Sequence, residues 1–242
     1  MNNYQLWDRY MRAYDFLMNV KAYQQSLADI LNIAEPKGKD RILDAGSGTG
    51  NLSIMLKAHG AQVVSLDFAL SALSIHRAKD PGAELLHASL EETLPLSDAS
   101  LETICCASVL FTLSQRGRRT AINEFYRILK PGGRLILTMG TRQAGLFKLL
   151  QMHYAGLRTI RSRSLAAVRL MLDIPQLAAI AYYNFKLQRL PHNQGFSILN
   201  ESDLRTLLSK PGFTDISVKS TYGASFLLVV ATKGRQPFGH CF

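Results

Sequence analysis

Residues 42–53 read Ile-Leu-Asp-Ala-Gly-Ser-Gly-Thr-Gly-Asn-Leu-Ser, and this stretch decides the fold. Its apolar opening predicts a buried strand, and the apolar spacing that follows residue 51 predicts a helix. Three glycines between the two elements allow a sharp turn and the close approach of a ligand to the backbone: Gly46, Gly48 and Gly50. Thr49 or Asn51 is expected to cap the helix.

Two aspartates flank this turn in the sequence. Asp67 ends the next apolar run, seventeen residues after Gly50, where an acid can accept hydrogen bonds from both ribose hydroxyls of an adenosine. Asp44 opens the turn, where a carboxylate would repel a phosphate and attract an ammonium group. The pattern therefore predicts a ligand that combines adenosine with a positive charge, and S-adenosylmethionine fits that description.

Residues 44–50 (Asp-Ala-Gly-Ser-Gly-Thr-Gly) and 124–135 (Glu-Phe-Tyr-Arg-Ile-Leu-Lys-Pro-Gly-Gly-Arg-Leu) carry a family resemblance. In both stretches the chain resembles the class I S-adenosylmethionine-dependent methyltransferases, and among them the branch that methylates quinones, lipids and natural products. The alternative is a glycine turn in some other α/β protein, which the second stretch disfavours. The resemblance implies a Rossmann-like α/β fold whose seven-stranded sheet has the order 3-2-1-4-5-7-6, with strand 7 antiparallel.

The resemblance also implies which residues hold S-adenosylmethionine and release S-adenosylhomocysteine. They are Asp44, Gly46, Ser47, Gly48, Gly50, Asp67, Phe68, Ser89, Leu90, Ala107 and Tyr14. Phe68 offers a stacking face for adenine. Ser89 departs from the family, which usually has an aspartate there, and the backbone amide of Leu90 is an alternative adenine contact. Tyr14, followed by Asp15, matches a Tyr-Asp pair on an N-terminal helix that often closes over the cofactor in the family.

The composition suits one domain with an inserted segment. The chain has 242 residues, a net charge of +10 and only three cysteines, which give neither a disulfide framework nor a metal-ligand spacing. No metal is expected. The polar and aromatic start is unlike a signal peptide, so a reducing cytoplasm is the expected location.

Periodicity and turn residues predict the remaining elements. Helices are expected over 4–34, 51–59, 70–79, 117–129 and 201–209, the last capped by Asn200. Strands are expected over 41–45, 62–67, 84–88, 103–108, 134–140, 213–220 and 225–232.

Residues 141–195 interrupt the family core, which we expect to comprise 1–140 and 196–242. This insertion contains eight basic residues and one acid, interleaved with apolar ones, and predicts basic amphipathic helices broken near Gly156 and Pro175. In the resembled enzymes a substrate lid lies here. Three interpretations compete: a helical cap with solvated arginines, a lid that docks peripherally on an anionic membrane, or an RNA-binding face, which is the least favoured.

Methyl transfer from a sulfonium is an in-line displacement, so the protein mainly aligns the reactants and excludes water. If the acceptor needs a base, His192 at the end of the insertion is the first candidate, ahead of His153, His76 and His87. The predicted function is methylation of a small lipophilic molecule. The alternatives are an RNA-modifying methyltransferase and a relative that binds the cofactor without catalysis. No DNA partner is expected, and the sequence does not predict the oligomeric state.

Overall fold

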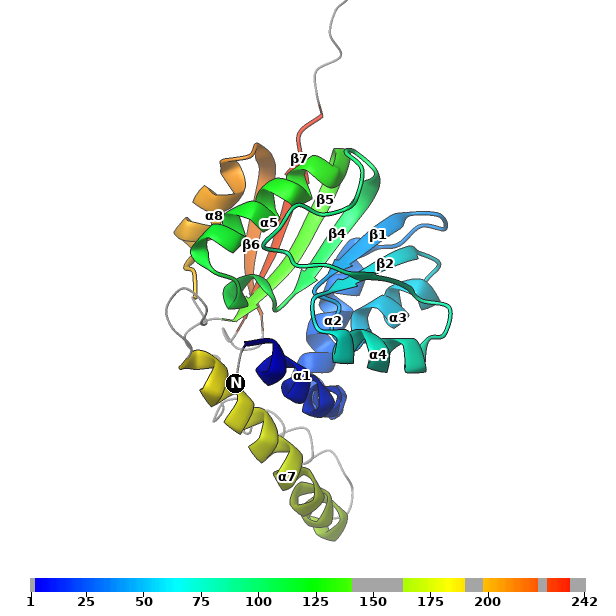
Figure 1. Ribbon diagram of the computed structural model, residues 1–242, viewed down its shortest axis with the longest axis vertical. Coiled ribbons are helices and arrows are strands. Elements are labelled where there is room, and N and C mark those ends of the chain that lie inside the picture. Colours follow the sequence, from blue (N-terminus) through cyan, green and yellow to red (C-terminus); the bar gives the residue numbers. More distant parts are fainter. Residues whose placement is uncertain (1–2, 141–162, 190–197, 222–225, 236–242) are drawn as a thin grey trace, which may run out of the picture.

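The computed structural model describes residues 3–140, 163–189, 198–221 and 226–235. A seven-stranded sheet with the order β3-β2-β1-β4-β5-β7-β6 forms its centre (Figure 1). The strands are β1 (Arg41–Ala45), β2 (Gln62–Asp67), β3 (Glu84–His87), β4 (Leu101–Ala107), β5 (Leu129–Gly140), β6 (Phe213–Thr221) and β7 (Phe226–Lys233). β7 is antiparallel to both β5 and β6, whereas the other pairs are parallel. The predicted strand order and the antiparallel strand are confirmed.

Side chains alternate between two cores on opposite faces of the sheet, as the pleat of a strand requires. On β1, Ile42 packs with α2 (Lys21–Ala34) and α3 (Asn51–Ala58), whereas its neighbour Leu43 packs with α5 (Gln115–Ile128) and α8 (Glu201–Ser209). The remaining helical elements are α1 (Asn3–Tyr14), η1 (Asp15–Asn19), α4 (Leu70–Lys79), η2 (Leu110–Thr112) and α7 (Arg163–Gln188). Asn200 caps α8 in a capping box with Asp203, as predicted.

The single helix predicted over 4–34 is wrong. The structure divides it into α1, the short 3₁₀ helix η1 and α2, with the break at Val20, whose ψ of 112° is extended. Val20 is fully buried in a third apolar cluster that joins α1, α4 and α7. The break therefore turns α1 away from α2 and lets it lie against α4 and α7.

α7 is a 26-residue helix that continues through Pro175, where the sequence predicted a break. A proline removes one backbone donor and crowds the preceding turn. The buried side chains of Asp173, Leu177 and Ile180 fall on one face on both sides of the proline, so burial of that face favours a continuous helix. The far end of α7 projects beyond the body of the molecule (Figure 1). Within the described ranges, no helix combines the length and apolar character needed to cross a bilayer.

Candidate active site

The glycine turn joins β1 to α3 at the carboxyl ends of the central strands. Gly46, Gly48 and Gly50 all have positive φ, at 78°, 54° and 85°. A Cβ on Gly46 would lie 2.4 Å from a methyl group of Val109, so this position also lacks space for a side chain. Gly50 itself is the N-cap of α3 and no side chain caps the helix, so the predicted capping by Thr49 or Asn51 is wrong.

Asp67 connects the end of β2 to the glycine turn. One carboxylate oxygen accepts a hydrogen bond from the backbone N–H of Gly48 at 2.8 Å, and the other accepts one from Ala69 at 2.8 Å. Burial raises the pKa of this carboxyl group, and hydrogen bonds from the backbone N–H groups of Ala69, Gly48 and Phe68 partly offset the shift. Two carboxylate oxygens offer about four acceptor positions in all. At least one position therefore remains on Asp67 for a ribose hydroxyl.

Asp44 also lies near the carboxyl ends of the central strands, but it is only 1% exposed. Its carboxylate accepts a hydrogen bond from the Ser53 hydroxyl at 2.6 Å, and Ser53 in turn accepts one from Ser65 at 2.8 Å. Burial raises the pKa of Asp44 to about 7; the Ser53 hydrogen bond lowers it and repulsion from Asp67 raises it further. The charge on Asp44 is therefore poised to change near neutral pH, and a nearby cation would favour its ionised form.

Aromatic side chains of α1 lie close to the carboxyl ends of the central strands. The Tyr14 ring packs edge-to-face on Tyr10 and Tyr23, with ring centroids 5.6 and 5.7 Å apart. Burial raises the pKa of the Tyr14 phenol well above its ordinary value, so the hydroxyl stays neutral. Trp7 contacts the edge of Phe68 at 6.2 Å and so helps to orient the ring predicted to stack on adenine.

A polar group that we call the Lys79 cluster (Asp15, Thr49, Asn51 and Lys79) ties η1 and α4 to the glycine turn. The Lys79 ammonium donates to Asp15 at 2.7 Å, to the Thr49 carbonyl at 3.0 Å and to the Asn51 side chain at 2.9 Å. The Thr49 hydroxyl also donates to Asp15. Sequence reasoning missed this cluster, because no local pattern relates residues so far apart.

Two buried polar side chains beside the turn have no hydrogen-bond partner among the described residues: Ser47 and His76. The imidazole of His76 is fully buried below Gly50, and this burial lowers its pKa. His76 therefore packs beneath the turn and is not placed to remove a proton from a methyl acceptor. The unsatisfied Ser47 hydroxyl lies within the turn, and an orphaned buried group there fits a ligand with polar atoms.

The other predicted contacts lie on the loops that follow β3 and β4. The Ser89 hydroxyl accepts a hydrogen bond from the Glu91 N–H at 3.2 Å, and the side chain of Leu90 is buried in the core. Ala107 ends β4. Ser108 follows it with φ of +58°, an unusual conformation for a residue other than glycine, which often marks a functional loop. His192 and His153 lie outside the described residues.

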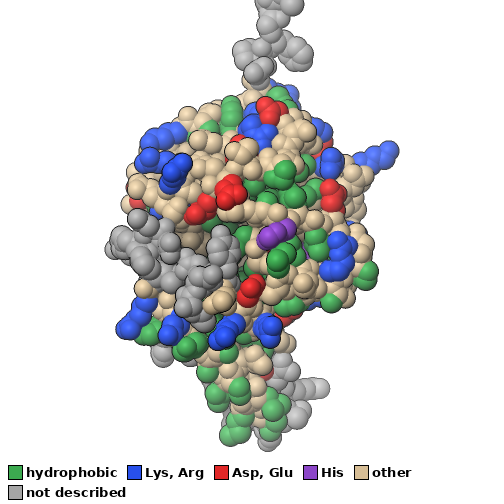
Figure 2. Space-filling view, viewed as in Figure 1, with side chains coloured by type: hydrophobic (Ala, Val, Ile, Leu, Met, Phe, Trp, Pro, Cys, Tyr) green, Lys and Arg blue, Asp and Glu red, His purple; other side chains and the backbone are tan. Residues whose placement is uncertain are grey.

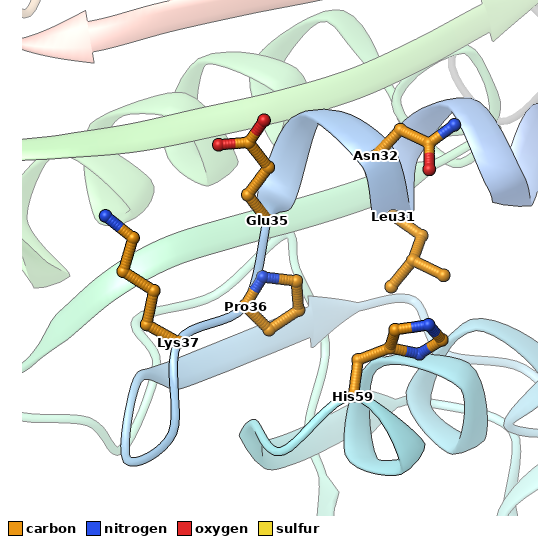
Figure 3. A pocket seen from close by; sticks show the side chains of 6 residues that line it. All are labelled: Leu31, Asn32, Glu35, Pro36, Lys37 and His59. Carbon is orange, nitrogen blue, oxygen red and sulfur yellow. The ribbon is translucent and has the colours of Figure 1, made fainter.

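A separate hollow lies near the amino ends of the strands, and Figure 3 shows the side chains that line it. It has a volume of about 620 Å³ and is lined by Leu31, Asn32, Glu35, Pro36, Lys37 and His59. These residues precede β1 or follow α3, at the amino ends of the strands. Ligands of open α/β sheets bind at the carboxyl ends of the strands, so this hollow is distinct from the candidate site.

Sequence comparisons point to one kind of enzyme. A family profile described as a methyltransferase domain matches residues 43–137. A demethylmenaquinone methyltransferase from Clavibacter sepedonicus is 33% identical over 138 residues, which cover 54% of this chain and 55% of that protein. A ubiquinone/menaquinone biosynthesis C-methyltransferase from Syntrophotalea carbinolica is 32% identical over 163 residues, covering 61% and 67%. The chain spans about half the length of the first curated relatives it matches.

Solved structures share the fold. A methyltransferase from Thermotoga maritima superposes with a TM-score of 0.63 at 17% identity, covering 96% of this chain and 100% of the other. Phosphoethanolamine N-methyltransferase 2 from Haemonchus contortus, solved in complex with S-adenosyl-L-methionine, gives a TM-score of 0.62 at 16% identity, covering 93% and 57%. At such low identity these structures support the architecture alone.

Proposed function

The chain belongs to the class I S-adenosylmethionine-dependent methyltransferases, and from this premise we propose that it methylates a small, lipophilic molecule. The observation that carries the proposal is the pairing of Asp67 with Gly48. It sets a buried carboxylate beside a turn in which three glycines carry no side chains.

The predicted residues fit the cofactor in distinct ways. Asp67 would accept hydrogen bonds from the ribose, Phe68 would cover the adenine, and Asp44 would attract the ammonium group of the amino-acid end. The cofactor supplies an electrophilic methyl group on a positively charged sulfur. The task left to the protein is to align the acceptor with that methyl group and to exclude water, which the helices near this edge would do.

One finding supports a lipophilic acceptor, and two further proposals accord with it. Curated relatives are named for quinone methylation. Residues 141–195, part of which forms α7, would serve as a lid over the acceptor, with His192 as a base if the acceptor must lose a proton. Peripheral contact of this segment with an anionic membrane would bring the enzyme to an acceptor that partitions into lipid.

Calorimetric titration with S-adenosylmethionine tests the site. Replacing Asp67 by Ala should weaken binding about 100-fold, because hydrogen bonding of the ribose to a charged group is lost. Glu201→Ala, which removes an exposed carboxylate on α8, is the matched control and should bind as the wild type does. Equal affinity of Asp67→Ala and wild type would refute the ribose assignment.

Activity is tested with a methyl-labelled cofactor and fractionated lipid and quinone extracts. Transfer of label to an organic-soluble product is the expected result. Transfer only to RNA would replace the proposed acceptor class. Tight cofactor binding without S-adenosylhomocysteine formation in any fraction would instead identify a relative that binds the cofactor without catalysis.

A further inference from the structure

Among the described side chains of α7, the solvent-facing ones between Val168 and Phe185 are mostly apolar. Its exposed apolar side chains are Val168, Met171, Leu172, Ile174, Tyr182 and Phe185, which we call the α7 stripe. Met171 and Leu172 are 71% and 69% exposed, so most of each residue's surface is in water. A monomeric soluble protein rarely leaves such a continuous apolar surface uncovered, so the stripe indicates a partner.

The opposite side of α7 is already occupied. Ile180 and Leu187 are buried in the cluster that joins α7 to α1 and α4. Tyr183 contacts the Tyr10 ring at 6.1 Å, and Asn184 hydrogen-bonds the Tyr10 hydroxyl. α7 is thus fixed to the body through one face near its carboxyl end, and the α7 stripe faces outward.

Exposed cations lie on α1 and near the carboxyl end of α7, two helices that pack against each other. Lys186, Arg189, Arg9 and Arg12 are all exposed, and we call them the basic rim. Lys186 lies over the Tyr182 ring at 5.6 Å and Arg189 over the Phe185 ring at 4.0 Å. Figure 2 shows lysine and arginine side chains in a row across the foot of the body, above the apolar side chains of the projecting part.

α1 and α7 contain two carboxylates, Asp8 and Asp173, against the four cations of the basic rim, so positive charge predominates. Asp8 accepts a hydrogen bond from the Ser71 hydroxyl at 2.7 Å, and Asp173 is buried. The surface therefore combines an apolar stripe with a border of positive charge, which is the combination that binds the interface of an anionic bilayer.

We propose that α7 docks on an anionic lipid surface, with Met171 and Leu172 entering the acyl boundary and the basic rim contacting the headgroups. A second copy of the chain fits less well, because two basic rims would repel each other. RNA would engage the cations but offers nothing to the aliphatic part of the stripe. This inference extends the proposed function, since a lipophilic acceptor partitions into the bilayer. Vesicle binding is measured without methyl transfer, so each can fail alone.

Flotation of the full chain with vesicles tests the docking. We expect binding to phosphatidylcholine mixed with phosphatidylglycerol, weakening with salt, and little binding to phosphatidylcholine alone. Met171→Glu combined with Leu172→Glu should reduce binding more than about tenfold, because both side chains would then resist burial. Thermal unfolding and circular dichroism of each variant establish that it is folded.

A charge-matched pair of variants separates the basic rim from general electrostatics. Lys186→Glu with Arg189→Glu should reduce anionic-vesicle binding at least about tenfold. Lys37→Glu with Lys39→Glu makes the same change in net charge, but just before β1, at the amino ends of the strands. This variant should bind vesicles nearly as well as the wild type.

Four results would overturn the proposal. They are absence of wild-type binding to anionic vesicles, unchanged binding of the Met171/Leu172 variant, an equal loss in the Lys37/Lys39 control, and a dimer in light scattering that the Met171/Leu172 variant abolishes. RNA binding that depends on the rim, without any vesicle binding, would also replace the membrane as the partner.

Discussion

Gly50 lies directly against the imidazole of His76: a Cβ built on Gly50 would fall 2.2 Å from the ring carbon Cδ2. The residue also has φ of +85°, a conformation that disfavours any side chain. The start of α3 and the middle of α4 thus meet at a glycine with no room for replacement. The contact with His76 restrains the glycine turn at Gly50, and the Lys79 cluster restrains it at Thr49 and Asn51.

The first prediction concerns this contact. Gly50→Ala should lower the free energy of unfolding by about 3 kcal/mol, through backbone strain and overpacking together. Adding His76→Ala should relieve the steric part and leave the backbone part, so the two substitutions should not be additive in chemical denaturation. A Gly50→Ala variant as stable as the wild type would contradict the contact.

The second prediction concerns acid stability. Burial lowers the pKa of His76 below 6.5 in the folded state, so the unfolded chain binds the proton more readily. Stability contributed by neutral His76 should therefore be present at neutral pH and decline as pH falls below about 6.5.

Asp44 and Asp67, whose pKa values are raised, act in the opposite direction over the acid range. The informative quantity is thus the difference in unfolding free energy between wild type and His76→Leu, measured at several pH values. That difference should change as pH falls below about 6.5, by up to about 1.4 kcal/mol per pH unit. A constant difference would mean that His76 has the same pKa in the folded and unfolded states.

The third prediction concerns the stability cost of Asp44. Its folded pKa of about 7 exceeds the ordinary 3.8, so stability is lost as pH rises through 7 and the buried carboxyl ionises. Asn keeps an acceptor for the Ser53 hydroxyl without the charge. Asp44→Asn should therefore be more stable than wild type at pH 8 by at least about 1 kcal/mol, and the gain should shrink toward pH 5. Thermal and denaturant unfolding at both pH values measure it.

The fourth prediction concerns the same group during binding. A cationic ligand favours ionised Asp44, so wild-type affinity for S-adenosylmethionine should fall as pH drops below about 7, with proton release on binding. Calorimetry in buffers of different ionisation enthalpy detects this release. Asp44→Asn should bind more weakly at pH 7 and lose most of the pH dependence. If the dependence persists in that variant, Asp67 is the titrating group.

The fifth prediction concerns the Lys79 cluster. Lys79→Met removes three hydrogen bonds that join η1 and the glycine turn to α4. Because the ammonium is partly exposed, global stability should change by less than about 1 kcal/mol. Amide exchange in residues 3–19 should nevertheless accelerate. Arg77→Met, on the same helix with its guanidinium bonded to Pro81, should leave exchange in 3–19 unchanged.

The strands of the sheet were predicted well because each one is marked by residues that are close together in the sequence. Continuous apolar runs mark the buried parallel strands, and the glycine turn and Asp67 lie at strand ends that the topology brings together. The hydrogen bond between Gly48 and Asp67 was not predicted, although both residues were expected at the cofactor site. Hydrophobic periodicity also identified α1 and α2, but it did not reveal the break at Val20, since a buried valine suits a helix and an extended residue equally well.

The wrong predictions for Thr49 and Pro175 have a common cause: contacts within the folded structure that the local sequence does not reveal. Thr49 does not cap α3 because its hydroxyl donates to Asp15, which lies 34 residues earlier. Pro175 does not end α7 because the residues on both sides of it bury the same face. His76 resembled a candidate base, although its spacing from Ala72 and Leu73 on one helical face was a signal that it belonged to the interior.

The antiparallel placement of β7 has a consequence for the nascent chain. Residues 134–140 of β5 pair with 226–232 of β7, so β5 has no partner on that side until more than eighty further residues have left the ribosome. At typical elongation rates this delay is on the order of 4 to 17 seconds. During that interval one side of an apolar strand stays open to other chains, and a chaperone that shields β5 should raise the yield of native protein.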